Sequence, residues 1–477
     1  MLIEKDMDLM QKLHILGDAA KYDVSCSSSG VDRRGDGKSL GNCLSAGLCH
    51  AFAGDGRCIS LLKILLTNEC IFNCRYCANN CNRADTPRAT FTPEEVCQLT
   101  VEFYRRNYIE GLFLSSGIRI SPLVTMEAIY QTVHQLRNVH HFYGYIHVKA
   151  IPGAPPELIE KTGYLVDRMS VNLELPTGEG LRHLAPNKNR KTLLTPMRQI
   201  QNLRQRNDQA FLPNSGSGQR NIKKQEDASL PGTLYGQKLP ARKGQWESRE
   251  KVQGFVPAGQ STQMIIGATP ESDYQIMKVS EGLYDRFQMK RVYYSAFCNV
   301  TEDTTLPMPV TGPPLLREHR LYQADFLMRF YQFKIDELLS EDKPNFNVFL
   351  DPKCDWALRH LEQFPVEIMR ADYQTLLRVP GIGVKSAKRI VAARRSAILD
   401  YQDLKKMGVV LKRALYFITC NGRQMYPVKV EEDYILSNLL NSENRAVREI
   451  GPVYRQLSLF DDQKATLTED GILVLDA

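Results

Sequence analysis

Hydrophobic positions between residues 60 and 300 alternate between short apolar runs and stretches in which apolar residues recur at helical spacing. The apolar runs predict strands at 60–66, 111–115, 144–149, 169–175, 263–267 and 291–296. The helical spacing predicts helices near 92–106, 122–137, 155–163, 192–206 and 270–284. Strands that alternate with helices are typical of a parallel sheet covered by helices. The pattern therefore predicts an α/β core of six strand–helix units.

Changes in this pattern divide the chain into segments. We expect an N-terminal Cys-containing extension (1–59), an α/β core (60–300) with a polar insertion (207–262), a helical connector (301–364), a second folded domain (365–425) and a tail (426–477). The insertion is net basic and interrupted by Pro and Gly, and a loop of this length inside a compact domain is usually functional or disordered. In the connector, apolar residues at helical spacing over 315–331 predict a helix.

Composition and charge exclude several classes of protein. The 477 residues have a net charge of +7, and their hydrophobic and charged fractions, 43% and 24%, are those of an ordinary soluble globular protein. The first residues carry acids where a signal peptide would be basic and then apolar. No apolar run approaches the roughly 20 residues of a membrane span. We therefore expect a cytoplasmic protein with no membrane partner.

Cysteines indicate metal chemistry. Eight of the twelve cysteines lie between residues 26 and 81, which suits metal binding in a reducing cytosol better than a disulfide scaffold. Cys70, Cys74 and Cys77 follow an apolar run at the spacing C-x3-C-x2-C. Most iron–sulfur clusters are held by four thiolates, so three would leave one iron without a protein ligand. A zinc knuckle is the alternative, but zinc usually takes four ligands in paired spacing.

This loop, with the aromatic Tyr76 before its last cysteine, resembles the cysteine motif of the radical S-adenosylmethionine (SAM) superfamily. The resemblance implies that Cys70, Cys74 and Cys77 hold one 4Fe–4S cluster, and that the open iron binds the amino and carboxyl groups of SAM. In that superfamily an electron cleaves SAM to a 5′-deoxyadenosyl radical. The resemblance also implies an open (β/α)6 partial barrel, with its chemistry at the carboxyl ends of the strands.

Other strand ends resemble the SAM-binding motifs of that superfamily. Two serines and a glycine at 115–117 stand where the family has Gly-Gly-Glu. Because the acid of that motif is missing here, the resemblance implies only that the backbone of these residues receives the SAM amino group. Apolar and polar residues alternate over 171–175, so the two polar residues of this run would share one face of a strand. The resemblance implies that polar side chains at this strand end hold the SAM ribose. The run 263–267 resembles the G-x-I-x-G adenine motif, and each run could also be an ordinary strand. The residues implied in SAM binding are Tyr76, Ser115, Ser116, Gly117, Asn172, Glu174, Ile265 and Gly267.

The N-terminal extension offers further soft ligands. Cys26, Cys49 and Cys58 are candidates for a second cluster. Buried free thiols at the entrance to the barrel are the alternative, which we favour. The pattern assigns no role to Cys43 or Cys81.

Residues 376–390 predict a helix, a Pro-Gly-Ile-Gly turn and a second helix. This run resembles the helix-hairpin-helix DNA-binding motif, with a degenerate second copy after Leu404. The two glycines would let the turn point N–H groups outward, and the positive end of the following helix favours phosphate. Six Lys or Arg residues and no acid lie between 376 and 395, as in a nucleic-acid-binding face; a protein-interaction turn is the alternative. The residues implied in DNA binding are Pro380, Gly381, Ile382, Gly383, Lys385, Lys388 and Arg389.

The tail contains one short apolar motif. Gln456, Leu457, Ser458, Leu459 and Phe460 closely resemble the pentapeptide by which bacterial polymerases and repair proteins dock on the sliding clamp. Such a peptide places its Leu and Phe anchors in an apolar groove. Packing against the C-terminal helices is the alternative.

Together these features resemble a family of bacterial radical SAM proteins with a C-terminal helix-hairpin-helix, proposed to modify or repair DNA. The resemblance implies a radical SAM enzyme whose partners are duplex DNA, an electron donor and a uracil-DNA-glycosylase-like protein. One alternative is an RNA-modifying radical SAM enzyme. The other is a non-catalytic, clamp-tethered DNA-binding protein whose cluster is structural or redox-sensing.

Overall fold

The computed structural model describes residues 7–20, 48–52, 58–210, 254–300, 303–307, 313–426, 431–432, 434–436, 438–439, 465–467 and 473–475. The chain divides into two compact units. The first comprises Met1–Pro270 and Val279–Pro307, and the second comprises Glu271–Lys278 and Met308–Ala477.

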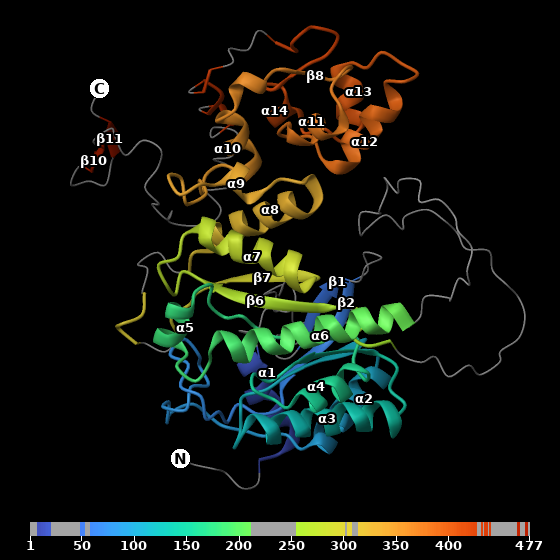
Figure 1. Ribbon diagram of the computed structural model, residues 1–477, viewed down its shortest axis with the longest axis vertical. Helices are drawn as coiled ribbons and strands as arrows, with labels where there is room; N and C mark the ends of the chain where they lie inside the picture. Colours follow the sequence, from blue (N-terminus) through green and yellow to red (C-terminus); the bar gives the residue numbers. More distant parts are fainter. Residues whose placement is uncertain are drawn as a thin grey trace, which may run out of the picture. The chain divides into compact units, whose positions relative to one another are not determined.

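A seven-stranded sheet forms the centre of the first unit (Figure 1). Its strands are β1 (Leu48–Phe52), β2 (Cys58–Leu65), β3 (Gly111–Ser115), β4 (Tyr145–Lys149), β5 (Arg168–Ser170), β6 (Gln260–Ile266) and β7 (Arg291–Ala296). The strands are adjacent in chain order; β2 to β7 are parallel, and β1 is antiparallel to β2. Because β1 and β7 are the two edges of the sheet, the sheet is open. This confirms the predicted α/β class and the open arrangement of six parallel strands.

Helices separate the parallel strands along the chain. They are α2 (Pro93–Arg105), α3 (Pro122–Asn138), α4 (Pro156–Gly163), α5 (Gly178–Leu184), α6 (Arg190–Ala210) and α7 (Asp273–Phe287), preceded by α1 (Leu9–Ala19). Helices α2, α3, α4 and α6 pack against one another in chain order. The start of α2 shows how the sequence sets an end: Thr92 caps the helix, Pro93 occupies its first turn, and Glu95 completes a capping box.

Three features of this unit differ from the pattern-based expectation. Strand β5 ends at Ser170, whereas the alternation predicted a strand through residue 175, because the Leu173 N–H donates to the Thr262 hydroxyl in place of a strand carbonyl and Glu174 has a φ of +68°. Strand β1 and helix α5 have no counterpart in the prediction. Helix α6 continues to Ala210 and β6 begins at Gln260, so both elements extend into the predicted insertion at 207–262.

The second unit is mainly helical. Its elements are α8 (Leu315–Tyr331), α9 (Ile335–Leu338), α10 (Pro352–Leu358), η2 (Leu361–Gln363), β8 (Val366–Glu367), α11 (Tyr373–Arg378), α12 (Val384–Ala393), α13 (Tyr401–Lys406), α14 (Leu411–Ala414) and β9 (Ile418–Thr419), followed by the β10 (Ala465–Leu467) and β11 (Leu473–Leu475) pair. Strands β8 and β9 are parallel, so they join the two ends of the segment that contains α11 to α14. The Glu367 carboxylate strengthens this closure by accepting the N–H groups of Asn421 and Gly422, at 3.1 and 2.8 Å.

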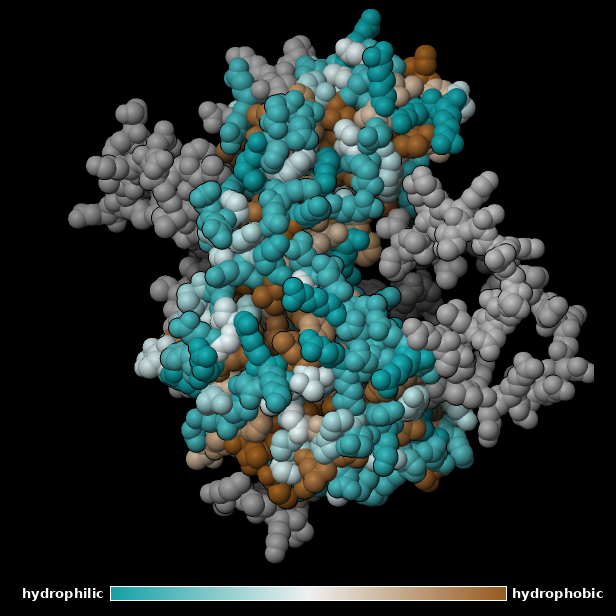
Figure 2. Space-filling view, in the orientation of Figure 1, coloured by the Kyte–Doolittle hydropathy of each residue, from teal (hydrophilic) through white to brown (hydrophobic). Residues whose placement is uncertain are grey.

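Hydrophilic side chains cover most of the face in Figure 2, and the hydrophobic ones form small patches. Among the described residues no helix is long and apolar enough to cross a membrane. The clamp-like peptide at 456–460, Cys26 and Cys43 lie outside the described residues.

Arg137 is the buried polar hub of the first unit. Its guanidinium pairs with Asp167 at 2.9 Å and donates to the carbonyl oxygens of Leu165, Phe142 and Gly144 at 2.9, 2.6 and 2.8 Å. We expect Arg137→Met to lower the free energy of unfolding by about 3 kcal/mol, because removing one partner of a buried ion pair leaves the other uncompensated. Thermal unfolding of the full chain measures the loss.

The matched control for this prediction is Arg105→Met. The Arg105 side chain is 73% exposed and pairs only loosely with Glu102, at 3.8 Å. We expect its removal to change stability by less than about 0.5 kcal/mol. Equal losses for the two variants would contradict the role assigned to Arg137.

Candidate functional site

The cysteine loop follows β2, at the carboxyl end of the first parallel strand, and lacks regular secondary structure. One side chain holds its backbone. The guanidinium of Arg88 donates to four carbonyl oxygens of the loop, those of Asn68 (2.6 Å), Asn79 (3.0 Å), Asn80 (2.7 Å) and Arg83 (3.0 Å). A planar guanidinium fixes the direction of the oxygens that it binds. Arg88 therefore sets the path of the backbone around the cysteines.

Two further side chains fix the loop near its second cysteine. The buried Asn80 amide donates to Asn73 Oδ1 at 2.8 Å and to the Cys74 carbonyl at 3.1 Å. Arg75 pairs with Asp303 at 2.9 Å, in the segment that follows β7. The loop is thus held by contacts within itself and by an ion pair to the segment that follows β7.

Backbone N–H groups point at two of the three sulfurs. Those of Phe72 and Ile118 lie 3.4 Å from Cys70 Sγ, and that of Asn79 lies 3.4 Å from Cys77 Sγ. Hydrogen bonds of this kind stabilise a thiolate and tune the potential of an iron–sulfur cluster. The donors are the ones that a cysteine-bound cluster uses.

Burial controls the ionisation of the thiols. It raises the pKa of Cys77 to about 12 and also raises the pKa of Cys74, and the nearby Cys70 adds to both shifts because like charges oppose each other. The three side chains are therefore close enough to affect one another. Metal binding would have to displace the protons of Cys74 and Cys77.

The cysteine loop offers thiol donors, the kind of ligand that holds an iron–sulfur cluster. Among the residues that the structure describes, no three His, Cys, Asp or Glu side chains converge on one point as the ligands of a single metal ion do. A cluster does not require that convergence, because each thiolate binds a different iron. Cys81, the fourth cysteine of the segment, is exposed and contacts Asn82, 3.6 Å away.

The loop after β3 lies against the cysteine loop. A Cβ added to Gly117 would lie 2.9 Å from the Glu69 carbonyl oxygen and 3.3 Å from Cys70 Cβ, so this close approach requires glycine. The Gly117 N–H donates to the Thr67 carbonyl oxygen at 2.7 Å. This backbone N–H of the predicted SAM contact therefore already has a partner. Ser115 Oγ is buried and has no hydrogen-bond partner among the described residues. A polar ligand atom would satisfy it.

Ser116 shares in the same loop. Its hydroxyl donates to the carbonyl oxygen of Gly117 at 2.6 Å. That carbonyl keeps a second lone pair for a ligand. The SAM contact predicted for residues 115–117 stays a prediction.

A nearly buried ion pair lies beside the second and third cysteines. Lys188 Nζ is 2.9 Å from Glu174 Oε1, and the two side chains are 12% and 9% exposed. The ammonium also lies 3.4 Å from the Tyr76 hydroxyl and 5.9 Å from the centre of its ring. Burial would lower the pKa of Lys188, but Glu174, Tyr76 and Cys74 outweigh it and keep the lysine charged. Sequence reasoning identified Glu174 and Tyr76 and missed Lys188.

The remaining predicted SAM contacts lie at or just after the carboxyl ends of β5 and β6. Asn172 is buried, with Nδ2 3.4 Å from Gln263 Oε1. Ile265 donates its N–H to the Glu174 carbonyl oxygen at 2.7 Å, and Gly267 has φ +88°. Asn172 and Glu174 were predicted to share one strand face, which is wrong because the strand ends earlier; the structure gives them separate partners.

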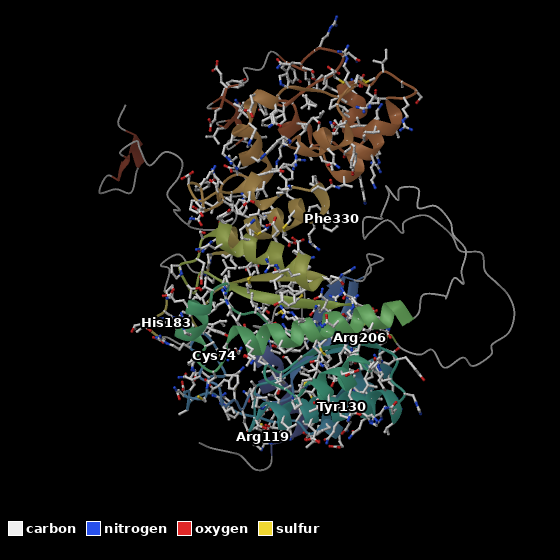
Figure 3. All side chains as sticks on the ribbon, viewed as in Figure 1. Cys74, Arg119, Tyr130, His183, Arg206 and Phe330 are labelled. Carbon is white, nitrogen blue, oxygen red and sulfur yellow. The ribbon has the colours of Figure 1, made fainter. Side chains whose placement is uncertain are left out.

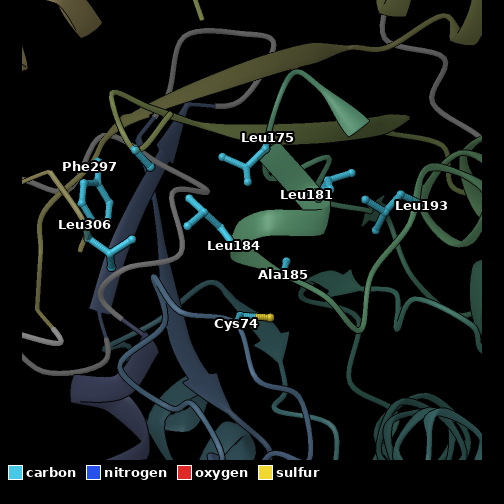
Figure 4. Packing of buried hydrophobic residues seen from close by; sticks show 9 residues of the cluster. Cys74, Leu175, Leu181, Leu184, Ala185, Leu193, Phe297 and Leu306 are labelled. Atoms are coloured by element: carbon cyan, nitrogen blue, oxygen red, sulfur yellow. The ribbon is translucent and has the colours of Figure 1, made fainter. Parts of the chain in front are cut away.

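An apolar cluster backs the loop (Figure 4). It consists of Cys74, Leu175, Leu181, Leu184, Ala185, Leu193, Ala268, Phe297 and Leu306, with Phe72, Tyr76, Cys77 and Ile265 packed against it. Four members come from α5 and its flanks, and His183 of that helix lies near Cys74 in Figure 3. Helix α5, which the pattern did not predict, therefore supplies one wall of the site.

The candidate ligands of a second cluster are only partly described. Cys49 lies in β1, opposite Leu61, and Cys58 begins β2, opposite Phe52. Their side chains and Cys26 lie outside the described residues. A second cluster stays a prediction.

In the second unit, α11 and α12 flank the Pro-Gly-Ile-Gly turn as the sequence predicts. Gly381 has φ +80°, and a Cβ there would lie 2.5 Å from the Val410 carbonyl oxygen. Gly383, by contrast, has φ −95°. It is the N-cap residue of α12, and no side chain accepts the first N–H groups of this helix. Only Gly381 therefore needs glycine for its conformation. Pro380 and Ile382 are buried, so they support the turn from inside.

The degenerate second copy forms α13, a turn and α14, and the two turns bind each other. Val410 donates its N–H to the Gly381 carbonyl oxygen at 2.9 Å. In return Ser386 Oγ and Arg389 Nη1 donate to the Met407 carbonyl oxygen, both at 3.2 Å. Arg389, implied as a DNA contact, thus also holds the second turn.

Lys385 and Lys388 are exposed on α12. An open hollow of about 370 Å³ lies along this helix, lined by Tyr373, Lys388, Val391, Ala392 and Arg395. Exposed cations beside uncapped backbone N–H groups form a surface that suits an anion.

The fold was compared with known proteins. No family model and no curated protein matches the sequence. The fold is similar to the crystal structure of HydG, a maturase of the FeFe-hydrogenase, with a TM-score of 0.35, 13% identity, and coverage of 56% of this chain and 48% of that chain. It is also similar to HydG from Carboxydothermus hydrogenoformans, with a TM-score of 0.33, 13% identity, and coverage of 56% and 50%. This chain therefore spans about half the length of these solved structures.

The Glu174–Lys188 pair generates a stability prediction. We expect Lys188→Met to lower the free energy of unfolding by about 3 kcal/mol, because it removes the cation that lies 2.9 Å from the nearly buried Glu174 carboxylate. Thermal unfolding of the full chain measures the loss.

The control is the double variant Glu174→Gln with Lys188→Met. It buries no charge, so we expect it to recover most of the lost stability. A double variant no more stable than Lys188→Met would contradict the assignment of the loss to the charge of Glu174.

Proposed function

We propose that this protein is a radical SAM enzyme that modifies or repairs a nucleotide in DNA. The observation that supports this proposal best is the loop of Cys70, Cys74 and Cys77. It lies at the carboxyl end of the first of six parallel strands and is braced by Arg88, with N–H donors aimed at two of its sulfurs. Three thiolates leave one iron open for a second ligand.

The residues of the first unit divide the work of binding. Cys70, Cys74 and Cys77 would hold the cluster, and the unpartnered Ser115 hydroxyl and the Glu174–Lys188 pair would contact SAM. When bound, the cluster would supply an electron and SAM would supply a 5′-deoxyadenosyl radical. The protein would orient both cofactors and exclude side reactions. The apolar cluster behind Cys74 keeps water from that side of the site.

The cysteine assignment can be tested by anaerobic reconstitution. We expect the wild type to hold a 4Fe–4S cluster and to cleave SAM when reduced. Replacing Cys70, Cys74 and Cys77 together by Ala should abolish both, because no thiolates remain to bind iron. Iron and sulfide analysis, the visible absorption spectrum and 5′-deoxyadenosine formation are the measurements.

Cys81→Ala is the matched control, because Cys81 is an exposed cysteine of the same segment whose thiol lies 3.6 Å from Asn82 Oδ1. It should retain both the cluster and SAM cleavage. A triple variant that kept full iron and SAM cleavage would refute the assignment. Reconstituted wild type that held iron but never cleaved SAM would favour the non-catalytic alternative.

DNA is the partner that the second unit supports best. The uncapped start of α12 and the turn before it offer backbone N–H groups to a phosphate, and Lys385 and Lys388 add charge beside them. Paired turns that contact phosphates would hold the DNA backbone without reading bases. Duplex DNA binding would bring the nucleotide to the enzyme, and a base would have to leave the stack to reach a buried site.

DNA binding by the full chain generates a further prediction. Affinity for duplex DNA should fall as salt rises, with a slope of about 0.9 per phosphate neutralised, and should not depend on sequence. Charge reversal at Lys385 and Lys388 should weaken all sequences alike and reduce the slope by about 1 for each lysine. Fluorescence anisotropy at several salt concentrations measures both quantities.

Charge reversal of Arg105 and Arg106, exposed on α2, is the control and should leave the salt slope unchanged. A preference for one DNA sequence or a salt-independent affinity would count against the proposal. Tighter binding of transfer RNA than of duplex DNA would favour the RNA-modifying alternative.

A further inference from the structure

A lysine is buried beneath the Pro-Gly-Ile-Gly turn. Lys353, in the first turn of α10, is only 7% exposed. Its Nζ donates to the Ile382 carbonyl oxygen at 2.7 Å and lies 4.7 Å from the centre of the Tyr331 ring. A buried ammonium is costly unless it is hydrogen-bonded, so its position indicates a role in this contact. Lys353 belongs to the predicted connector, outside the helices that form the hairpin.

Two neighbouring groups fix Lys353 and the turn together. The Asp351 carboxylate caps α10 by accepting the N–H groups of Lys353 and Cys354, and it pairs with Arg413 of α14 at 3.1 Å. The Tyr331 hydroxyl, at the end of α8, would lie 3.5 Å from a Cβ added to Gly383. The connector therefore contacts the turn at both Ile382 and Gly383.

The Lys353 bond fixes the direction of one peptide group. In a planar trans peptide the C=O of one residue and the N–H of the next point in opposite directions. Because the Ile382 C=O points inward to Lys353, the Gly383 N–H points away from α10. The Gly381 C=O is held in the same way by Val410. Gly381 N–H and Gly383 N–H have no hydrogen-bond partner among the described residues.

We propose that Lys353 is a positioning residue for DNA binding, which orients the Ile382–Gly383 peptide so that the Gly383 N–H meets a phosphate. The proposal rests on the DNA binding proposed above. Lys353 is too buried to touch DNA itself, which distinguishes it from Lys385 and Lys388. Its ammonium adds a positive charge behind the turn.

The same geometry predicts a dependence on pH. Burial lowers the pKa of Lys353 to about 7; Asp351 and Cys354 oppose this shift and Arg378 adds to it. Tyr331 also faces the ammonium. A phosphate bound at the turn would favour the charged lysine and raise its pKa. DNA binding would then take up protons, so affinity should fall as the pH rises through and above about 7.

The test uses the full chain and one duplex, with wild type and Lys353→Met at about pH 6 and about pH 8. We expect wild-type affinity to fall by several-fold between these pH values. Lys353→Met should bind about tenfold more weakly at the lower pH, as expected for a lost buried hydrogen bond, and should lose the pH dependence. Its salt slope should equal that of the wild type, because no phosphate contact is removed.

The outcomes separate this inference from the proposed function. A wild type that does not bind DNA would refute the proposed function. A wild type that binds and is weakened by charge reversal at Lys385 and Lys388, but is unaffected by Lys353→Met, would overturn the positioning role alone. If Lys353→Met fails to fold by thermal unfolding, the wild-type pH profile decides, and an affinity equal at both pH values overturns the inference.

Discussion

A loop that presents three thiols to one cofactor cannot place its peptide groups in a helix or a sheet, so those groups need other partners. In this protein the Arg88 guanidinium supplies partners for four carbonyl oxygens. Asn80 and the Arg75–Asp303 pair hold the part of the loop near Cys74. Together these side chains give the cysteines a fixed arrangement in space.

Local patterns predicted the parts of the fold whose determinants are local. The strands at 111–115 and 291–296 were predicted at the positions where β3 and β7 occur, because each is a short apolar run bounded by polar residues. Helix α2 begins at Pro93, where the helical spacing predicted a helix near 92–106, and its capping residues are likewise local. The turn between α11 and α12 followed from Pro380 and Gly381, which restrict or require particular backbone angles.

Side-chain partners distant in sequence could not be predicted in this way. Helix α5 separates Lys188 from Glu174 in the chain, and only the fold brings the two charges together. The end of β5 was misplaced because Val171 to Leu175 alternates like a strand, while Glu174 has a positive φ that alternation cannot reveal. Lys353 lies far before the turn that it contacts, and its sequence neighbours give no sign of burial.

The second hairpin copy contributes to the first through main-chain atoms: the Val410 N–H and the Met407 carbonyl oxygen. Every residue except proline supplies both groups, so side chains at these positions are under little selection from this contact. Gly408, with φ +90°, is the exception. The segment from α13 to α14 can therefore brace the turn before α12 with many different side chains at Met407 and Val410.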